Sequence, residues 1–393
     1  MRKSIRNLFL PSRMVWLIRR HAMLVVAALF ALATIIIVPP DSAYLGYFDW
    51  NTLGCLFSVL AVANAFRFAG AFDRIARAAI ERLSTPTSVA MALVATTGAL
   101  SMVATNDLAL IIMLPITLYA LFKAGWNALI APVFVLEGLA ANLCGMIVPF
   151  GNPQNLYLYS FYSIGVADFV KTMALPFLVS TVLIVACTFV LVQKSGARPA
   201  QIEPIVKEPL DRSRLAIYTL LLVFALLAVL RMVPVALVVA AILVTLAAMD
   251  RRALKAVDYS LLLTFVCFFV FAGNMARMPH LGELLGGLMG SDGLVASALL
   301  SQVISNVPAA VLLSHFTGSW PSLLVGVNIG GAGTLIASLA SLIVLRYFTE
   351  ARRIFPSLAK SPALSTGRFM KLFSCLNFGF LVVLLMVCHL SGV

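Results

Sequence analysis

The sequence is poor in charged residues, and this shortage excludes an ordinary soluble domain. Only 11% of the 393 residues are charged, whereas 62% are hydrophobic. Average soluble domains are about 25% charged and about 45–50% apolar. Because so few polar side chains cannot cover a soluble globule of this length, long apolar segments must face lipid. The composition therefore predicts an all-α polytopic membrane protein.

The sequence also lacks the motifs of several membrane enzymes and of nucleotide hydrolysis. No HExxH, GxGD, GxSxG or GxxxxGK[ST] pattern occurs. The cysteines have no CxxC spacing and stand in apolar runs, as small packing residues do: Cys55, Cys144, Cys187, Cys267, Cys375 and Cys388. We therefore predict that the chain is not an enzyme and carries no cofactor.

Basic residues outnumber acidic ones by 28 to 15, which gives a net charge of +13. Such an excess suits nucleic acid as well as a membrane surface, but here the basic residues stand between long apolar runs. Cytoplasmic loops of membrane proteins carry an excess of Lys and Arg. The charge therefore favours a lipid bilayer as partner, and no nucleic acid is expected.

Apolar runs recur along the chain, and a helix needs about 20 such residues to cross a bilayer. The runs fall at 22–39, 49–66, 85–104, 108–122, 127–149, 169–192, 215–230, 233–249, 258–275, 292–304, 309–320, 321–345 and 370–389. Two pairs of runs are joined by polar breaks, at 105–107 and 305–308. Irregular backbone at membrane depth is tolerated only inside protein or beside a wet cavity. Each pair therefore predicts a re-entrant helical hairpin, which leaves nine crossings.

The distribution of charge predicts an orientation. With the N-terminus in the cytoplasm, 25 of the 28 Lys and Arg residues fall on the cytoplasmic side, and only Lys171, Arg231 and Arg277 fall outside. The first apolar run ends in 39-Pro-Pro-Asp-41 instead of a small-residue cleavage site, so we expect a retained helix. The positive-inside rule thus predicts a multi-pass topology with a cytoplasmic N-terminal segment at 1–21, and we expect the protein in a bacterial inner (plasma) membrane.

The two halves of the chain match each other. Asp49 and Asp258 each begin an apolar run, Asn106 and Asn306 mark the two breaks, and residues 142–156 align with 328–342. The aligned stretches each predict a broken transmembrane helix, because Gly, Pro or small polar residues interrupt the apolar pattern. We predict two inverted-topology repeats, 22–193 and 233–393, joined by a cytoplasmic loop and a linking helix at 194–232.

Polar residues at the breaks are the candidate ligands. A helix that begins at mid-membrane offers unpaired N–H groups and about half a positive charge, so it binds anions without a buried Lys or Arg. The predicted substrate and ion site comprises Thr105, Asn106, Asp107, Asn142, Gly151, Asn152, Pro153, Asn155, Ser305, Asn306, Asn328, Gly331, Thr334 and Ser338. Candidate Na⁺ ligands are Asn106, Asp107 and Asn306.

Three ionisable groups lie in or near these runs. Asp107 stands at a break and is a candidate to carry a proton or to hold Na⁺. Glu137 lies about ten residues into its run, where a buried, hydrogen-bonded carboxyl is an equal alternative. His315 lies near the second hairpin, and interfacial packing explains it better than function.

Three stretches resemble the ion transporter superfamily, which includes citrate transporters, divalent anion:sodium symporters, arsenite efflux permeases and some sodium/proton antiporters. They are TND at 105–107, ANLCGMIVPFGNPQNL at 141–156, and SNVPA at 305–309 with GVNIGGAGTLIASLASL at 326–342. The resemblance implies the superfamily fold and a homodimer. In the dicarboxylate branch each tip is Ser-Asn-Thr and binds Na⁺ and a carboxylate. Because Asp107 and Val307 replace the Thr here, proton coupling stays open.

These features predict a secondary active transporter that moves a small anion, a carboxylate or oxyanion, by alternating access coupled to H⁺ or Na⁺. Two alternatives come from the same superfamily, an arsenite efflux permease and a Na⁺/H⁺ antiporter. A passive channel is the alternative from another class. Helix dipoles suit an anion whereas the oxygens of the tips suit a cation, so the sequence leaves the choice open.

Overall fold

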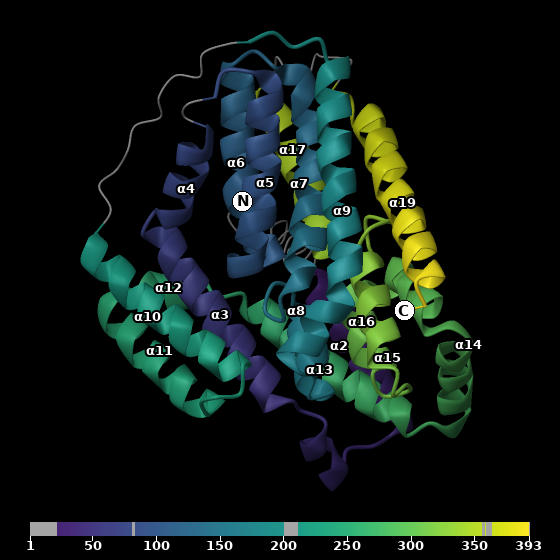
Figure 1. The fold of residues 1–393 in the computed structure, drawn as a ribbon. Coiled ribbons are helices and arrows are strands. Elements are labelled where there is room, and N and C mark those ends of the chain that lie inside the picture. The colour runs from purple at the N-terminus through teal and green to yellow at the C-terminus, as the bar shows by residue number, and fades with distance from the viewer. Residues whose placement is uncertain (1–21, 81–82, 200–210, 356–357, 359–363, 393) are drawn as a thin grey trace, which may run out of the picture.

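The computed structural model describes residues 22–80, 83–199, 211–355, 358 and 364–392 (Figure 1). The predicted cytoplasmic segment at 1–21 and part of the predicted loop at 194–232 lie outside these ranges. Within them the chain is helical, with three short 3-10 turns and no β-strand.

The helices of the first half of the chain are α2 (Ala22–Ile37), α3 (Trp50–Phe68), α4 (Ala71–Ile80), α5 (Pro86–Ala104), α6 (Asn106–Lys123), α7 (Ile130–Cys144), α8 (Pro153–Phe161) and α9 (Val166–Lys194). Those of the second half are α10 (Arg212–Val229), α11 (Val235–Met249), α12 (Arg251–Lys255), α13 (Tyr259–Ala276), α14 (Pro279–Ile304), α15 (Asn306–Leu313), α16 (Trp320–Ile329), α17 (Leu339–Ile354) and α19 (Thr366–Leu390). The 3-10 turns are Ser42–Gly46, Asn127–Leu129 and Gly145–Ile147.

Nine stretches of the described chain are helical, long and apolar enough to cross a membrane: α3, α5, α6, Asn127–Ile147, α9, α10, α13, α14 and α19. The protein is therefore a multi-pass membrane protein. The apolar helices α2, α11 and α16 are shorter. Several of the long helices expose large apolar side chains, for example Val182 on α9 and Leu220 on α10. A helix that is apolar on its outer face suits lipid.

Two predicted runs differ from the helices observed. The run at 309–320 is not one helix, because α15 ends at Leu313 and a turn precedes α16. The run at 292–304 is only the end of α14, which begins at Pro279 and is kinked at Asp292 (φ −158°, ψ 89°). The predicted interruption of the run at 321–345 is observed between Ile329 and Leu339.

Helix α7 is the buried centre of the molecule. Thirteen of its fifteen residues are buried, and it packs against α5, α6, α9 and α17. Figure 1 shows α5, α6, α7 and α9 side by side in the upper half of the view and α14, α15 and α16 in the lower half. Helices α10, α11 and α12 pack on α3 at the left. The two predicted hairpins therefore occupy different halves of the molecule.

Two of the matched helices begin in the same way. Asp49 accepts a hydrogen bond from the Thr52 N–H (2.9 Å) at the start of α3, and Asp258 accepts one from the Leu261 N–H (3.1 Å) at the start of α13. A side-chain oxygen at this position satisfies an N–H group that has no partner within the helix. Both helices thus begin where the sequence predicts.

Candidate functional site

Two helix breaks have nearly identical backbone geometry. Between α5 and α6 stands Thr105, with φ 72° and ψ 151°, and between α14 and α15 stands Ser305, with φ 76° and ψ 154°. This region is almost reserved for glycine and costs another residue about 1–3 kcal/mol. Strain of this kind persists only where the surrounding structure holds it. We call these two positions, with the Asn that follows each, the tips.

Each tip is bonded to a second break in its own half of the chain. The Asn106 N–H donates to the Gly151 carbonyl (3.2 Å), and the Asn306 N–H donates to the Ala337 carbonyl (2.9 Å). The Ser305 hydroxyl also donates to Ala337 (3.3 Å). The second breaks therefore supply the acceptors that fix the tips.

The second breaks resemble each other as well. Extended backbone at Asn152 (φ −132°, ψ 146°) leads into α8, and extended backbone at Ser338 (φ −145°, ψ 143°) leads into α17. The Ser338 hydroxyl accepts from the Ala340 N–H (3.2 Å). Pro153 is the first residue of α8, where its missing N–H leaves no hydrogen bond unmade. Each break therefore directs the N-terminus of a helix into the protein interior.

Glycines let the chain pass closely at these breaks. A Cβ at Gly151 would lie 2.0 Å from the carbonyl oxygen of Gly145. A Cβ at Gly331 would lie 2.4 Å from Nδ2 of Asn142 and 2.9 Å from Nδ2 of Asn306. At Gly151 a side chain would clash with backbone, whereas at Gly331 it would clash with the ends of two Asn side chains, which would have to move. Gly331 thereby brings Asn306 of the second tip close to Asn142 of α7.

Asn328, in the last turn of α16, is the centre of a cluster of buried amides. Its Nδ2 donates to Oδ1 of Asn155 (2.6 Å), and its Oδ1 accepts from Asn152 (3.3 Å) and Gln154 (3.2 Å). The Asn152 amide also donates to the Asn142 carbonyl (3.1 Å), and the Asn142 amide reaches the Asn328 carbonyl (3.5 Å). These five side chains, the amide cluster, are all buried and join both halves of the chain.

Four buried polar atoms at the breaks have no hydrogen-bond partner among the residues that the structure describes. They are Oδ1 of Asn142, Oδ1 of Asn152, Nδ2 of Asn306 and Oδ1 of Asp107. Leaving such an atom unpaired costs about 1–3 kcal/mol, so it points to a function such as holding an ion or a ligand. The oxygens can accept from a ligand or hold a cation, whereas the Asn306 amide can donate to an anion.

The two intramembrane carboxyls differ in their surroundings. Asp107, in the first turn of α6, is part-buried with one unpaired oxygen. Glu137 on α7 is fully buried, and its Oε1 accepts from the hydroxyls of Thr97 (3.1 Å) and Thr117 (2.6 Å). Glu137 therefore ties α7 to α5 and α6, as a buried hydrogen-bonded carboxyl does, although its Oε2 is unpaired.

The remaining predicted residues lie away from the amide cluster. Thr334 donates through its N–H to Oε1 of Gln302 (2.9 Å) and through its hydroxyl to the Gln302 carbonyl (3.0 Å). His315, in the turn after α15, contacts the Val311 carbonyl (3.0 Å) and the ring of Phe161 (5.2 Å). Thr334 thus braces the unwound segment after α16, and His315 packs between helices.

Sequence reasoning missed two amides at the site. Gln154 bonds directly to Asn328, and Gln302 donates to the carbonyls of Gly330 (2.8 Å) and Ala332 (3.1 Å). Gln154 stands inside the polar stretch at 151–155, which was a usable signal. Gln302 stands alone in an apolar run, where only the fold reveals its partners.

Asn106, Asp107 and Asn306, the candidate Na⁺ ligands, are split between the first turns of α6 and α15. Oδ1 of Asn106 accepts from the Asp107 N–H (2.9 Å), so it stays within its own tip. Across the described ranges, no group of three or more His, Cys, Asp or Glu side chains is placed to hold a metal ion. Any cation here would be bound by amide, hydroxyl and backbone oxygens with Asp107.

Residues 14–319 match the model of a family described as citrate transporter. The chain is 33% identical over 316 residues to the inner membrane protein YbiR of Escherichia coli, which covers 77% of this chain and 81% of that one. It is 33% identical over 303 residues to the uncharacterized transporter MJ0456 of Methanocaldococcus jannaschii, covering 76% and 81%. It is 25% identical over 335 residues to the uncharacterized transporter Rv2685 of Mycobacterium tuberculosis, covering 76% and 78%.

Proposed function

The chain belongs to the citrate transporter family of membrane transporters, and we propose that it moves a small carboxylate or oxyanion across the inner membrane by secondary active transport. It is a transporter and not an enzyme. One observation carries the proposal of an anion site. The helix breaks at Thr105 and Ser305 adjoin the buried amide cluster, and buried polar atoms of both the tips and the cluster lack a hydrogen-bond partner.

The proposed site binds its anion without a buried Lys or Arg. Four helices begin at the breaks, namely α6, α8, α15 and α17, and the positive end of each helix dipole favours an anion nearby. The unpaired Nδ2 of Asn306 supplies a further donor. The oxygens of Asn142 and Asn152 accept from hydroxyl groups of the substrate or contact the coupling ion. The other predicted residues at 105–107, 151–155 and 305–338 shape and support this site.

We assign coupling to Asp107. A carboxyl with an unpaired oxygen inside the membrane is costly unless it takes up a proton or a cation. If Asp107 is protonated during the transport cycle, the coupling ion is H⁺. If Asp107 holds Na⁺ together with Asn106 and Asn306, the coupling ion is Na⁺. Uptake driven by a pH gradient or by a Na⁺ gradient separates these two schemes.

We propose that residues 22–193 and 233–393 are inverted repeats, linked through 194–232, and that one moves against the other to alternate access. The matched tips, their bonds to Gly151 and Ala337, and the matched helix starts at Asp49 and Asp258 support this. Single cysteines introduced at Arg74 and Arg346 should react only with a cytoplasmic reagent. Labelling of either from outside would contradict the orientation.

The homodimer implied by the family resemblance is part of the proposal. It predicts that purified protein in detergent has twice the protein mass of one chain, measured by light scattering with the detergent subtracted. A measured mass equal to one chain would contradict the proposed dimer but would leave the proposed site unchanged.

Uptake of labelled citrate, other small carboxylates and oxyanions into proteoliposomes tests the site. A hydrogen bond to a charged group contributes about 1.5–3 kcal/mol, so Asn306→Ala should weaken apparent affinity about tenfold or more. Asn106→Ala should also reduce uptake. Asn377→Ala is the matched control, because this buried amide on α19 donates only to the Phe373 carbonyl within its own helix. Unchanged uptake in both tip variants would remove the site assignment.

One observation favours a second candidate, a Na⁺/H⁺ antiporter. Three of the four unpaired atoms are oxygens, from Asp107, Asn142 and Asn152, and oxygens suit a cation as cargo. Expression that protects cells against high sodium, with no uptake of any anion tested, would favour this candidate. Protection against arsenite would instead indicate an efflux permease of the same superfamily.

A further inference from the structure

A polar cavity lies at the C-terminal end of α8, whereas the amide cluster is at its N-terminal end. Its volume is about 390 Å³, and α3, α8 and the turn between α10 and α11 line it. Pockets for small molecules measure roughly 300–1,000 Å³. Leu156, which lines the cavity, directly follows Asn155 of the amide cluster, but no residue of the amide cluster itself lines the cavity. The cavity is therefore close to the candidate transport site but distinct from it.

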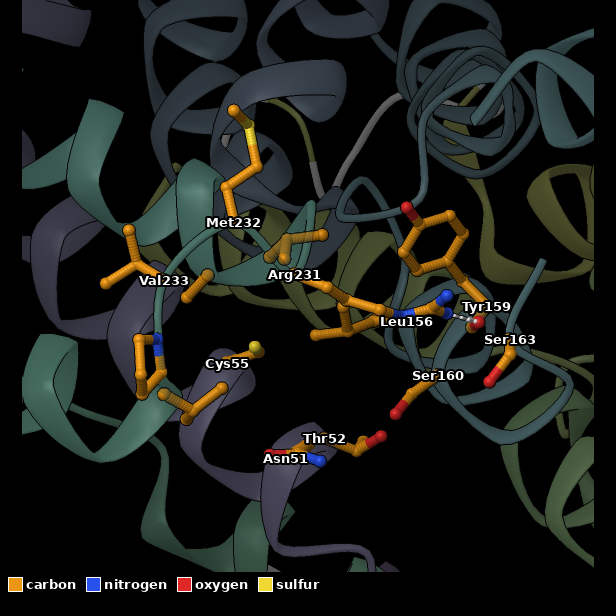
Figure 2. A pocket seen from close by; sticks show the side chains of 14 residues that line it. Asn51, Thr52, Cys55, Leu156, Tyr159, Ser160, Ser163, Arg231, Met232 and Val233 are labelled. Atoms are coloured by element: carbon orange, nitrogen blue, oxygen red, sulfur yellow. Dashed lines mark hydrogen bonds between the residues drawn. The ribbon is translucent and has the colours of Figure 1, made fainter. Parts of the chain in front are cut away.

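One cation and several polar groups converge on this cavity. Figure 2 shows Arg231 on one side, Ser160 and Ser163 of the α8 end on another, and Asn51 with Thr52 of α3 opposite. The Arg231 guanidinium donates to the Tyr159 carbonyl and lies over the Tyr159 ring, 4.6 Å from its centroid. These contacts fix the direction of the guanidinium and leave most of its five N–H groups available.

Arg231 has no carboxylate partner among the described residues. The nearby carboxylate of Asp49 accepts from the N–H (2.9 Å) and the hydroxyl (2.5 Å) of Thr52. Arg277, another basic residue outside the predicted cytoplasmic segments, is paired with Asp41 (2.7 Å). Arg231 thus differs from Arg277 in presenting an unneutralised positive charge to a cavity.

The backbone at Arg231 has an unusual left-handed conformation. Its φ is 61°, in the left-handed region that residues other than glycine rarely adopt. The turn from α10 to α11 therefore holds this side chain against α8 at a conformational cost. A Gly or Asn at this place would relieve the backbone but would supply no cation.

We propose that this cavity is a second anion-binding site, which takes a small carboxylate or a phosphate-type oxyanion on the Arg231 guanidinium. Ser160, Ser163 and the amide of Asn51 supply further donors around the same space. A planar guanidinium matches two oxygens of a carboxylate or phosphate at once. The site does not depend on the transport site. Its position on the outer side rests on the orientation proposed above.

The anion has two possible sources with the same chemistry, a free anion in solution and the phosphate of a lipid headgroup. A reporter cysteine at Val233, an apolar and part-exposed residue of the cavity wall, distinguishes them. The rate at which Val233→Cys reacts with a maleimide is read at this residue by mass spectrometry. Inorganic phosphate and citrate are added in detergent and in phosphatidylcholine vesicles, and phosphatidylglycerol vesicles are tested without added anion.

Protection of the reporter is the expected result. At ten times its Kd an anion fills about nine-tenths of the sites, so labelling should slow about tenfold. Protection by citrate or phosphate in phosphatidylcholine supports a free anion, and protection confined to phosphatidylglycerol supports a lipid headgroup. Arg231→Gln should abolish protection, Arg231→Lys should keep part of it, and Lys171→Gln, which removes another exposed positive charge, should change nothing.

Two results would overturn the proposal. One is an unchanged labelling rate under every condition in the Val233→Cys protein. The other is protection that survives Arg231→Gln, which would show that Arg231 only holds α8 in place. The test is repeated with Asn106→Ala and Asn306→Ala, where protection should persist although transport is lost. A failure of the transport site and a failure of this second site are thus separate outcomes.

Discussion

Any side chain at position 151 would clash with the backbone of Gly145. A Cβ there would lie 2.0 Å from the carbonyl oxygen of Gly145 and 2.9 Å from its carbonyl carbon. Backbone cannot move as cheaply as the end of a flexible side chain, and the Gly151 carbonyl also accepts the Asn106 N–H. The cost of a methyl group at Gly151 therefore extends to the first tip.

Gly151→Ala should destabilise the protein by about 1–3 kcal/mol, as overpacking does elsewhere, and should impair transport. Thermal unfolding in detergent measures the loss. Gly379→Ala on α19 is the matched control, because a Cβ there meets nothing within 4 Å and alanine favours a helix. Equal melting temperatures for the two variants would contradict the close approach of Gly145 and Gly151.

Arg277 and Asp41 form a bidentate ion pair between the segment after α2 and the end of α13. The two nitrogens donate to the two carboxylate oxygens at 3.0 and 2.7 Å, and one also donates to the Tyr47 hydroxyl (3.1 Å). These hydrogen bonds and the charge of Arg277 hold the pKa of Asp41 below its ordinary value of 3.8. The pair therefore stabilises the fold while Asp41 is ionised.

This stabilisation should depend on pH in one direction. A lowered carboxyl pKa contributes fully above the unfolded value, near pH 4, and the contribution disappears as pH falls through the lower folded pKa. Wild type should melt at a higher temperature than Asp41→Asn at pH 6, and the difference should shrink in acid and vanish once the pH is below the lowered folded pKa of Asp41. A difference that stays constant across this range would show that Asp41 acts by packing and not by charge.

At the scale of elements, the two tips store backbone strain at matching places. Thr105 makes no capping hydrogen bond through its side chain, so its hydroxyl does not offset the strain locally. Ser305 bonds to Ala337, which offsets part of it. Strain held at such a position is typical of a site where geometry or a hydroxyl serves function.

Thr105→Gly should separate stability from transport. Glycine relieves about 1–3 kcal/mol of backbone strain, but its greater freedom in the unfolded chain offsets part of this. We therefore expect the free energy of unfolding to rise by about 1 kcal/mol. Transport should fall because the hydroxyl is lost. Thr105→Ser keeps the hydroxyl and the strain, so it should match wild type in both assays. Full transport in Thr105→Gly would show that the Thr105 hydroxyl has no role.

The elements show what the sequence can predict. Both tips and both second breaks were predicted at the residues where the helices change, because polar, Gly or Pro residues inside an apolar run interrupt a membrane helix. The amphipathic helix α4 was missed because it is short and charged, although Phe72 and Ala76 form a buried stripe on it. The start of α14 and its kink at Asp292 were missed because glycines and polar residues weaken the apolar pattern there.

The partners within the site could not be predicted in the same way. Asn152 directly precedes α8, Asn155 lies on α8 and Asn328 lies on α16, but the bonds between them depend on how α8 packs against α16. Gln302 has no neighbour in sequence that suggests its role. Burial of an isolated amide is costly, so partners must exist, but the sequence does not say which they are.

At the scale of the whole molecule, buried and lipid-facing surfaces divide the helices into two kinds. Helix α7 is enclosed and carries Asn142 and Glu137, whereas α9, α10, α14 and α19 are mostly exposed and apolar. The candidate residues gather where helices from the two halves meet, as in the amide cluster of Asn152 and Asn328. In the proposed alternating-access mechanism, movement of one half against the other would open and close this site.

Counterflow of a labelled anion in proteoliposomes tests most directly whether the two tips form the site of an alternating-access carrier. Vesicles loaded with an unlabelled anion that the protein transports should briefly accumulate the labelled anion above its external concentration, because a carrier exchanges substrate and a channel does not. We predict this overshoot in wild type and in Asn377→Ala, and its loss in Asn106→Ala with Asn306→Ala. Flux without an overshoot, or an overshoot unchanged in the double variant, would contradict the carrier site at the tips.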